Sequence, residues 1–123
     1  MKIDFDQHPT TLTIAAYAAG WVRVRDTRLE ASCVITPSAI HRDLLPAEFE
    51  QLHAGHFERL IALAPEIILL GTGARQRFAD HAFTAHLAAA GIALESMDTG
   101  AACRSFNILA AEDRAVIAAL FMI

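Results

Sequence analysis

The sequence predicts an α/β domain built in layers, with parallel strands at its centre and an added antiparallel hairpin. The continuous apolar run over residues 67–70 is typical of a strand buried on both faces of a sheet. A helical pattern over residues 80–90 separates that run from a second apolar segment, residues 92–94. Because a strand–helix–strand unit normally closes as a right-handed crossover, we expect the two strands to be adjacent, parallel and buried.

The first third of the chain is expected to consist of strands. Residues 11–16 and residues 21–24 alternate with the period of a strand, and residues 17–20 between them can form a turn. These segments predict the hairpin. Residues 33–36 predict a further strand, which ends at Pro37 because proline cannot donate to a ladder.

Three helices are expected after these strands. The first begins near Pro46, keeps its apolar residues on one face and ends at Pro65. The second covers residues 80–90 and ends at Gly91, a residue that commonly closes helices. The third covers residues 100–109.

Two later segments are harder to interpret. The strand predicted over residues 92–97 carries Glu95 near its middle, and a covered carboxylate must be paired or protonated. Arg104 or Arg114 is the expected partner. Residues 115–121 are ambiguous, because their alanines favour a helix whereas their Val, Ile and Phe residues allow a terminal strand.

Composition limits the class of protein. A chain of 123 residues is expected to form one domain (1–123), and a hydrophobic share of 54% allows a sizeable core. The net charge is −4, and basic residues are scattered apart from Arg pairs at residues 23–25 and 75–77, which argues against nucleic acid as a partner. The acidic start, residues 1–6, is unlike a signal peptide, and no apolar run reaches the ~18 residues of a membrane span. We therefore expect a cytoplasmic protein without direct membrane insertion.

Catalytic and metal-binding patterns are weak. Cys33 and Cys103 lie far apart in apolar surroundings and are expected to be reduced, buried thiols. Among the histidines only His53 and His56 share helical spacing, whereas a metal site needs three or four ligands. Nucleophilic catalysis by Ser105 or Cys103 would need a neighbouring base, and no histidine is near either in sequence. We expect no catalytic residue, no metal site and no cofactor.

A candidate ligand site lies where the two predicted parallel strands end. Residues 71–73 follow the first strand and residues 98–100 follow the second, where ligands collect in open α/β sheets. A helix that starts there offers free N–H groups and a positive dipole to an anion, and Arg104 would add a full charge. The candidate ligand-binding residues are Gly71, Thr72, Gly73, Asp98, Thr99, Gly100, Arg104, Ser105 and Asn107.

Turns and helix caps explain the same residues without a ligand. Asp98 or Thr99 is a natural N-cap, and two glycines after a buried strand usually form a tight turn. Gln76 stands where a dinucleotide-binding fingerprint has its third glycine, and no Gly-Lys-Ser/Thr completes a phosphate loop. Ser105 and Asn107 are expected to satisfy buried backbone groups. We therefore favour the structural interpretation and keep the anion site as an alternative.

The second half of the chain resembles a known family. The segments that carry the resemblance are residues 65–73, 91–92, 95–99, 102–109 and 112–120. They resemble the small bacterial proteins of unknown function related to mitochondrial NADH dehydrogenase (complex I) assembly factor 3. The resemblance implies a three-layer β+β/α fold with a mixed central sheet whose last strand, residues 115–121, is antiparallel. It implies no established enzyme activity and no cofactor.

This chain departs from the family in two places. The family often has Trp after the first proline, where this chain has residues 40–44. The family usually has Arg-Thr-Tyr-Asn where this chain has Arg104-Ser105-Phe106-Asn107, so Phe106 lacks the phenol. The first interpretation is a non-enzymatic protein-interaction domain with an unidentified protein partner, assisting assembly of a membrane protein complex. The alternative is a domain that binds an anion or nucleotide at the strand-end loops, and an enzyme using Cys103 or Ser105 comes third. An exposed apolar patch would favour the first, and a concave pocket at the strand ends the second.

Overall fold

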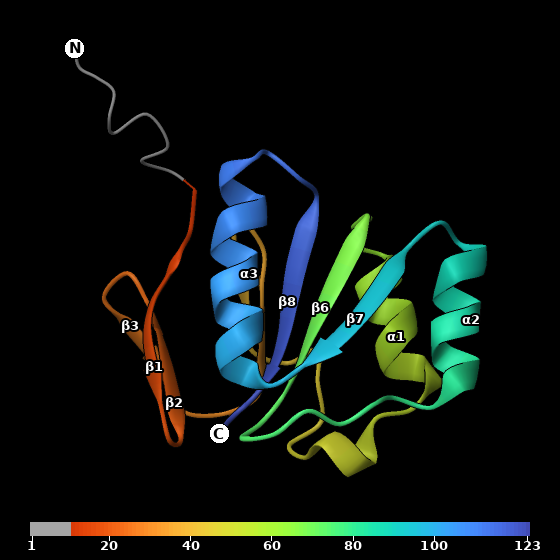
Figure 1. The fold of residues 1–123 in the computed structure, drawn as a ribbon, viewed down its shortest axis with the longest axis horizontal. Helices are drawn as coiled ribbons and strands as arrows, with labels where there is room; N and C mark the ends of the chain where they lie inside the picture. The colour runs from red at the N-terminus through yellow and green to blue at the C-terminus, as the bar shows by residue number, and fades with distance from the viewer. Residues whose placement is uncertain (1–10) are drawn as a thin grey trace.

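A computed structural model describes residues 11–123 and arranges them in three layers around a five-stranded sheet (Figure 1). The acidic start of the chain, residues 1–6, on which the signal-peptide expectation depends, lies outside the described residues. The sheet has the strand order β5-β4-β8-β6-β7. Its strands are β4 (Cys33–Ile35), β5 (Ile40–His41), β6 (Ile67–Thr72), β7 (Ala93–Met97) and β8 (Val116–Phe121). Residues 115–121 therefore hold a strand rather than a helix, as the resemblance implies.

The central sheet is mixed, as expected, but a different strand runs against the others. β6 pairs in parallel with β7 and with β8, whereas β4 pairs antiparallel with both β8 and β5. The expectation that the last strand is antiparallel is therefore wrong, since β4 is the strand that opposes the rest. The reason is the connection before β8. A helix returns the chain from the end of β7 to the opposite edge, so β8 starts where β7 started and runs the same way.

β6 and β7 are adjacent and parallel as predicted, but only β6 is a buried central strand. β7 lies at the edge of the sheet, so the expectation of a second buried strand is wrong. The chain crosses back over β6 after β7 and places β8 on the far side, which leaves β7 with one neighbour. Glu95 on this edge is exposed and needs no partner. The expected pairing of Glu95 is also wrong, because Arg104 contacts Tyr17 and Arg114 forms an ion pair with Glu66.

The predicted hairpin is present and belongs to a small second sheet. This sheet contains β1 (Ile14–Ala18), β2 (Trp21–Val24) and β3 (Thr27–Leu29), all antiparallel. β3 was not expected, because three residues are too few to show a strand period. Its one buried side chain, Leu29, joins Val22 and Val24 in facing the rest of the protein.

The helix expected between Pro46 and Pro65 is divided into two pieces. A short 3-10 helix covers Phe49–Gln51, and α1 covers Ala54–Ile61. Between them, His53 is extended, and its Nδ1 accepts a hydrogen bond from the Gly55 N–H at 3.1 Å. The His56 ring accepts one in return from the His53 N–H at 3.1 Å, which completes a capping box. The two histidines with helical spacing thus form a helix start.

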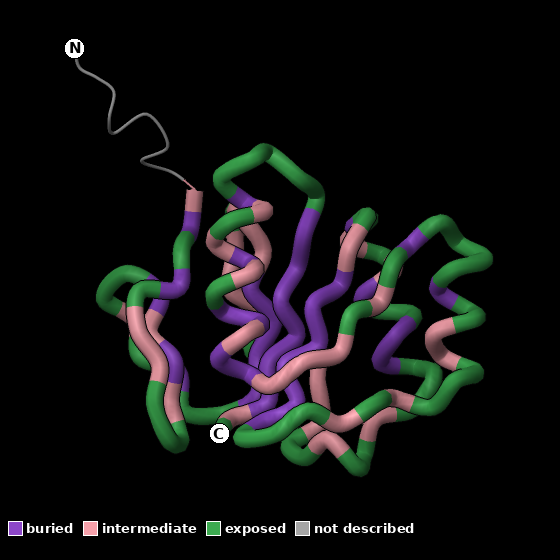
Figure 2. The backbone as a smooth tube through the Cα atoms, in the orientation of Figure 1, coloured by how far each residue is buried: buried purple, intermediate pink, exposed green. Residues whose placement is uncertain are grey.

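The other two helices follow their predicted positions. α2 covers His81–Ala89 and α3 covers Thr99–Ala111, with Asp80 and Asp98 as their N-caps. α3 and the small sheet lie on one side of the central sheet, and α1 and α2 lie on the other (Figure 1). Burial is concentrated in the central strands, whereas the loops and outer helix faces are exposed (Figure 2).

Alternate side chains of β6 contribute to two separate cores. Leu69 faces α3 and the small sheet, where it joins Phe106 and Leu120. Ile68 and Leu70 face α1 and α2 on the other side. All five side chains are at most 2% exposed. Because β6 is covered on both faces, its sequence is apolar at successive positions rather than at every second one.

Candidate functional site

The turns after β6 and β7 come together as predicted, and they bond to each other. The Gly73 N–H donates to Oγ1 of Thr99 at 2.8 Å, and the Thr99 N–H donates to the Gly73 carbonyl at 2.9 Å. The Thr99 hydroxyl then donates to the carbonyl of Phe121, at the end of β8, at 2.6 Å. One fully buried threonine therefore joins the ends of three segments.

The Thr72 hydroxyl has a similar role in the loop after β6. It lies 2.7 Å from the carbonyl oxygen of Arg75 and 3.1 Å from that of Met97, and it accepts the Arg77 N–H at 3.0 Å. Thr72 is only 2% exposed. Both predicted threonine hydroxyls are thus occupied by protein groups, which fixes the loop against the neighbouring strand.

Two of the predicted glycines are needed for close packing. A Cβ at Gly71 would lie 2.9 Å from Cδ2 of Leu120 and 3.0 Å from Oγ1 of Thr99. A Cβ at Gly100 would lie 2.9 Å from Cε1 of Tyr17, whose ring rests on the first turn of α3. These distances are too short for any side chain without a shift of the neighbours, so packing alone explains both glycines.

The remaining predicted residues lie on or near α3. Asp98 is the N-cap as predicted, and its Oδ1 accepts the Ala101 N–H at 2.9 Å. Asn107 bonds to both backbone groups of Ile14, accepting its N–H at 2.8 Å and donating to its carbonyl at 2.9 Å. Exposed Arg104 donates to the Tyr17 hydroxyl, and Ser105 is half-buried. Asn107 therefore has the structural role expected of it.

Phe106, where the resemblance implies a tyrosine, lies in the core. Its ring is fully buried in the apolar cluster between α3, the small sheet and the central sheet. A phenol in such a place would need a hydrogen-bond partner. Its neighbour Asn107 and, one turn earlier, Arg104 reach the small sheet by hydrogen bonding.

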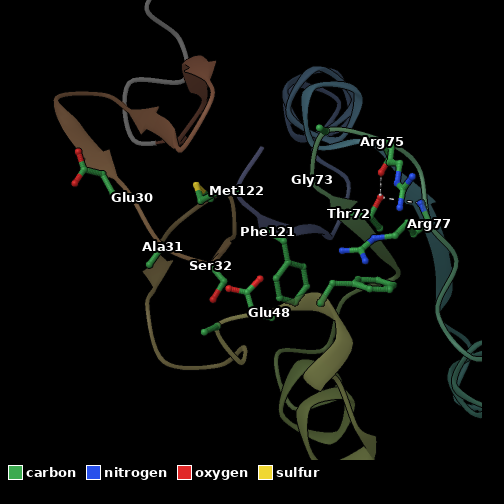
Figure 3. Close-up of a pocket in the computed structure, with 13 residues that line it drawn as sticks. Glu30, Ala31, Ser32, Glu48, Thr72, Gly73, Arg75, Arg77, Phe121 and Met122 are labelled. Atoms are coloured by element: carbon green, nitrogen blue, oxygen red, sulfur yellow. Dashed lines mark hydrogen bonds between the residues drawn. The ribbon is translucent and has the colours of Figure 1, made fainter.

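An open pocket lies at the carboxyl ends of β6 and β8 (Figure 3). We call it the strand-end pocket, and its volume is about 620 Å³. Of the nine predicted ligand-binding residues, only Thr72 and Gly73 line it. The side chains that define its character are Phe49, Phe121 and Met122, which are apolar, and Glu30, Glu48, Arg75 and Arg77, which are charged. Among these, the sequence singled out only the arginine pair, through its spacing at residues 75–77.

Two of the four charged side chains around the strand-end pocket are already engaged. Arg77 bonds to Glu50 at 2.5 Å, and its guanidinium carbon lies 4.4 Å from the centre of the Phe49 ring. This hydrogen bond from Arg77 holds the pKa of the Glu50 carboxyl below its usual range. Glu30 pairs with Arg28 at 2.9 Å. Within residues 11–123, the guanidinium of Arg75 has no hydrogen bond or ion pair.

A second hollow adjoins the strand-end pocket. It has a volume of about 260 Å³ and is called the aromatic groove below. It is lined by four large apolar side chains, by Ala79 and by two acidic ones: Phe49, Leu52, Phe78, Phe83, Glu50 and Asp80. Phe78 is 74% exposed, the highest value among the large apolar side chains that the structure describes. Phe49 lines both hollows, so the two form one continuous surface.

Both cysteines are free and buried, as the sequence predicts. Burial raises the pKa of the Cys33 thiol and that of the Cys103 thiol to about 12. A thiol with such a pKa stays protonated at neutral pH and is a poor nucleophile. Within residues 11–123, no group of three or more His, Cys, Asp or Glu side chains is placed to hold a metal ion.

We expect Cys33 and Cys103 to react with a thiol reagent at pH 8 about a hundredfold or more slowly than a free cysteine. The raised pKa leaves almost no thiolate at that pH, so the rate should climb only as the pH approaches about 12 or when the protein unfolds. Mass spectrometry of timed alkylation in the presence and absence of denaturant measures both rates. Labelling of the folded protein at the free-thiol rate would contradict the burial and revive a catalytic role for Cys103.

The fold and its hollows define a class of protein: a three-layer α/β domain with an open, partly apolar surface at the ends of its parallel strands. The sequence profile of a family described as "Protein of unknown function (DUF498/DUF598)" matches residues 14–121. This chain belongs to that family, which confirms the resemblance noted in its second half.

Three proteins illustrate what this chain is similar to. The crystal structure of a Bordetella parapertussis protein matches with a TM-score of 0.85 at 32% identity, over 93% of this chain and 98% of that one. The Bos taurus protein named NADH dehydrogenase (ubiquinone) 1 alpha subcomplex assembly factor 3 is 30% identical over 117 residues, 93% of this chain and 62% of its own length. A Francisella tularensis protein named 13 kDa major membrane protein is 32% identical over 69 residues, 56% of each chain.

The chain thus spans less than two thirds of each of these two named relatives. One of them carries the word membrane in its name. In the part of this chain that the structure describes, no helix combines the length and the apolar character needed to cross a bilayer.

Proposed function

We propose that this chain is a protein-binding domain that contacts its partner through the aromatic groove. The exposed ring of Phe78 is the observation that carries the proposal. It is 74% exposed and stands beside a hollow lined by Phe49, Leu52 and Phe83. Exposed apolar side chains grouped around a groove mark interaction sites, and buried aromatic anchors supply much of the binding energy of protein interfaces.

The name of one relative supports a role in assembly. The Bos taurus relative is named as an assembly factor for the NADH dehydrogenase 1 alpha subcomplex. An assembly factor acts by binding proteins, and an exposed aromatic groove suits that task. We infer that this chain likewise assists the assembly of a membrane protein complex and works in the cytoplasm.

The chemistry of the described residues supports a role without catalysis. The Cys103 thiol is buried, and its pKa is raised to about 12 by that burial. The Thr72 and Thr99 hydroxyls bond to backbone groups of the protein itself. The anion site predicted at the strand-end turns stays a prediction, with seven of its nine residues outside the strand-end pocket.

Partner capture with two matched surface variants tests the proposal. Phe78→Ser removes the exposed anchor of the groove, and Ile108→Ser removes an apolar side chain on α3 that is 61% exposed. Neither change opens a core. We expect a partner recovered from native lysate by the unmodified protein to be retained by Ile108→Ser and reduced about tenfold or more by Phe78→Ser.

Quantitative mass spectrometry of the recovered proteins measures this difference. Equal recovery by both variants would show that the aromatic groove is not the binding surface. Recovery of no specific partner by the unmodified protein would count against a protein-binding function.

A further inference from the structure

We propose that the strand-end pocket binds an extended segment of the protein partner in which an acidic and a basic side chain flank an apolar one. This inference rests on the proposed function and adds the chemistry of the bound segment. It follows from the placement of charge around the pocket, the apolar floor between the charges, and the continuity of the pocket with the aromatic groove.

The pocket has walls of opposite charge. Arg75 and Arg77 lie in the loop that follows β6, whereas Glu48 immediately precedes the short 3-10 helix. Figure 3 shows Glu48 and the two arginines on opposite sides of the Phe121 ring. A bound segment that crosses this ring therefore meets a basic wall at one end and an acidic wall at the other.

Arg75 is the basic side chain of the pocket that remains to be matched. Arg77 is held by Glu50 and Glu30 by Arg28, whereas the Arg75 guanidinium has no ion pair within residues 11–123. A guanidinium presents its N–H groups in a fork that fits a carboxylate with two parallel hydrogen bonds. An acidic side chain of the partner is the group that this geometry recognises best.

The acidic wall and the apolar surface of the pocket indicate which other two side chains the bound segment carries. The Glu48 side chain is exposed and forms no ion pair in the described part of the chain, so a basic side chain is its complement. The half-buried Met122 and the ring of Phe121, which is 4% exposed, give the pocket a small apolar surface. An apolar side chain between the two charges would remove this surface from water.

A peptide segment fits this pocket better than a free anion. A phosphate or a small carboxylate would contact Arg75 but leave the apolar floor and Glu48 unused. Glu30 and Glu48 would also repel a ligand with several negative charges. Phe49 lines both the pocket and the aromatic groove, so one extended segment can continue from the pocket towards Phe78.

Binding of short synthetic peptides tests this inference directly. The first set of fluorescein-labelled probes carries Glu and Lys on either side of a central Leu, Phe or Met, and the second set carries Lys in place of Glu. Fluorescence anisotropy at ~0.15 M salt measures the affinity of each probe for the unmodified protein, Arg75→Glu and Arg59→Glu. Arg59 is an exposed arginine on α1 and does not line the pocket, so it controls for the change in net charge.

We expect a Glu-containing probe to bind the unmodified protein and Arg59→Glu alike, and to bind Arg75→Glu about tenfold or more weakly. The Lys-for-Glu probes should show the reverse preference and favour Arg75→Glu. Affinity that does not depend on Arg75, or the failure of all probes to bind, would overturn the inference. Competition by inorganic phosphate as effective as that of unlabelled peptide would also overturn it, because it would show a site for a bare anion.

The two proposals fail in different ways. Capture of a partner that depends on Phe78 but not on Arg75, with no probe binding, would leave the protein-binding function standing and remove only the inference about the pocket. Loss of Phe78-dependent capture would remove the proposed function itself.

Discussion

Replacing Leu69 with alanine is expected to lower the free energy of unfolding by about 2–5 kcal/mol. Leu69 lies in the middle of β6 and is 2% exposed, packed in the cluster that contains Phe106 and Leu120. Removing most of its side chain forfeits the burial of apolar surface and leaves a cavity that close-packed neighbours cannot fill. Equilibrium unfolding in urea, followed by circular dichroism, measures the change.

A volume-conserving substitution provides the control. Leu69→Met keeps nearly the same volume and should cost less than about 1.5 kcal/mol. A loss below about 1 kcal/mol for Leu69→Ala would contradict the packing of this side of the central sheet.

Asn107→Ala is expected to destabilise the protein by about 2–4 kcal/mol, because it leaves two partly buried backbone groups without partners. The side chain accepts the Ile14 N–H and donates to the Ile14 carbonyl, so it joins α3 to β1 across 93 positions of the chain. Alanine is the best helix former, so the loss cannot come from the helix itself. Thermal and urea unfolding measure the stability, and hydrogen exchange of the Ile14 amide reports the lost bond.

Ser105→Ala is the matched control for Asn107. Ser105 lies on the same helix and is half-buried, and no hydrogen bond of its side chain is found within residues 11–123. We expect this variant to stay within about 0.5 kcal/mol of the unmodified protein. Equal stabilities for Asn107→Ala and Ser105→Ala, with an unchanged Ile14 exchange rate, would show that Asn107 does not hold the small sheet in place.

Patterns formed by residues a few positions apart, such as apolar runs and helix caps, were sufficient to predict several elements. The continuous apolar run over residues 67–70 identified the central strand β6, and Asp98 marked the start of α3. The resemblance of the second half identified residues 115–121 as a strand, which the residues alone left open. Periodicity and capping can be read in this way because they depend on residues a few positions apart.

Other features depended on contacts between distant segments. β7 has the apolar pattern of a strand but lies at the sheet edge, because α3 carries the chain past β6 before β8 pairs. The break between the 3-10 helix and α1 depends on the ring geometry of His53 and His56, which hydrophobic spacing does not show. Glu95 needs no partner because its side chain is exposed to solvent. That exposure could not be predicted from the strand pattern, because it depends on the position of β7 at the edge of the sheet.

The sequence by itself predicted the burial of both thiols, the structural role of Asn107 and the strands, turns and helices of the second half, where the family resemblance assigned residues 115–121. Only the tertiary structure decided the strand order, the exposure of Phe78 and the position of the strand-end pocket. That pocket takes its walls from four segments that are separate in the chain: residues 30–32, residues 47–49, residues 72–75 with residue 77, and residues 121–122. The physical reason is that local patterns fix how a segment folds, whereas a shared surface depends on which distant segments pair and on which side of the sheet each connection crosses.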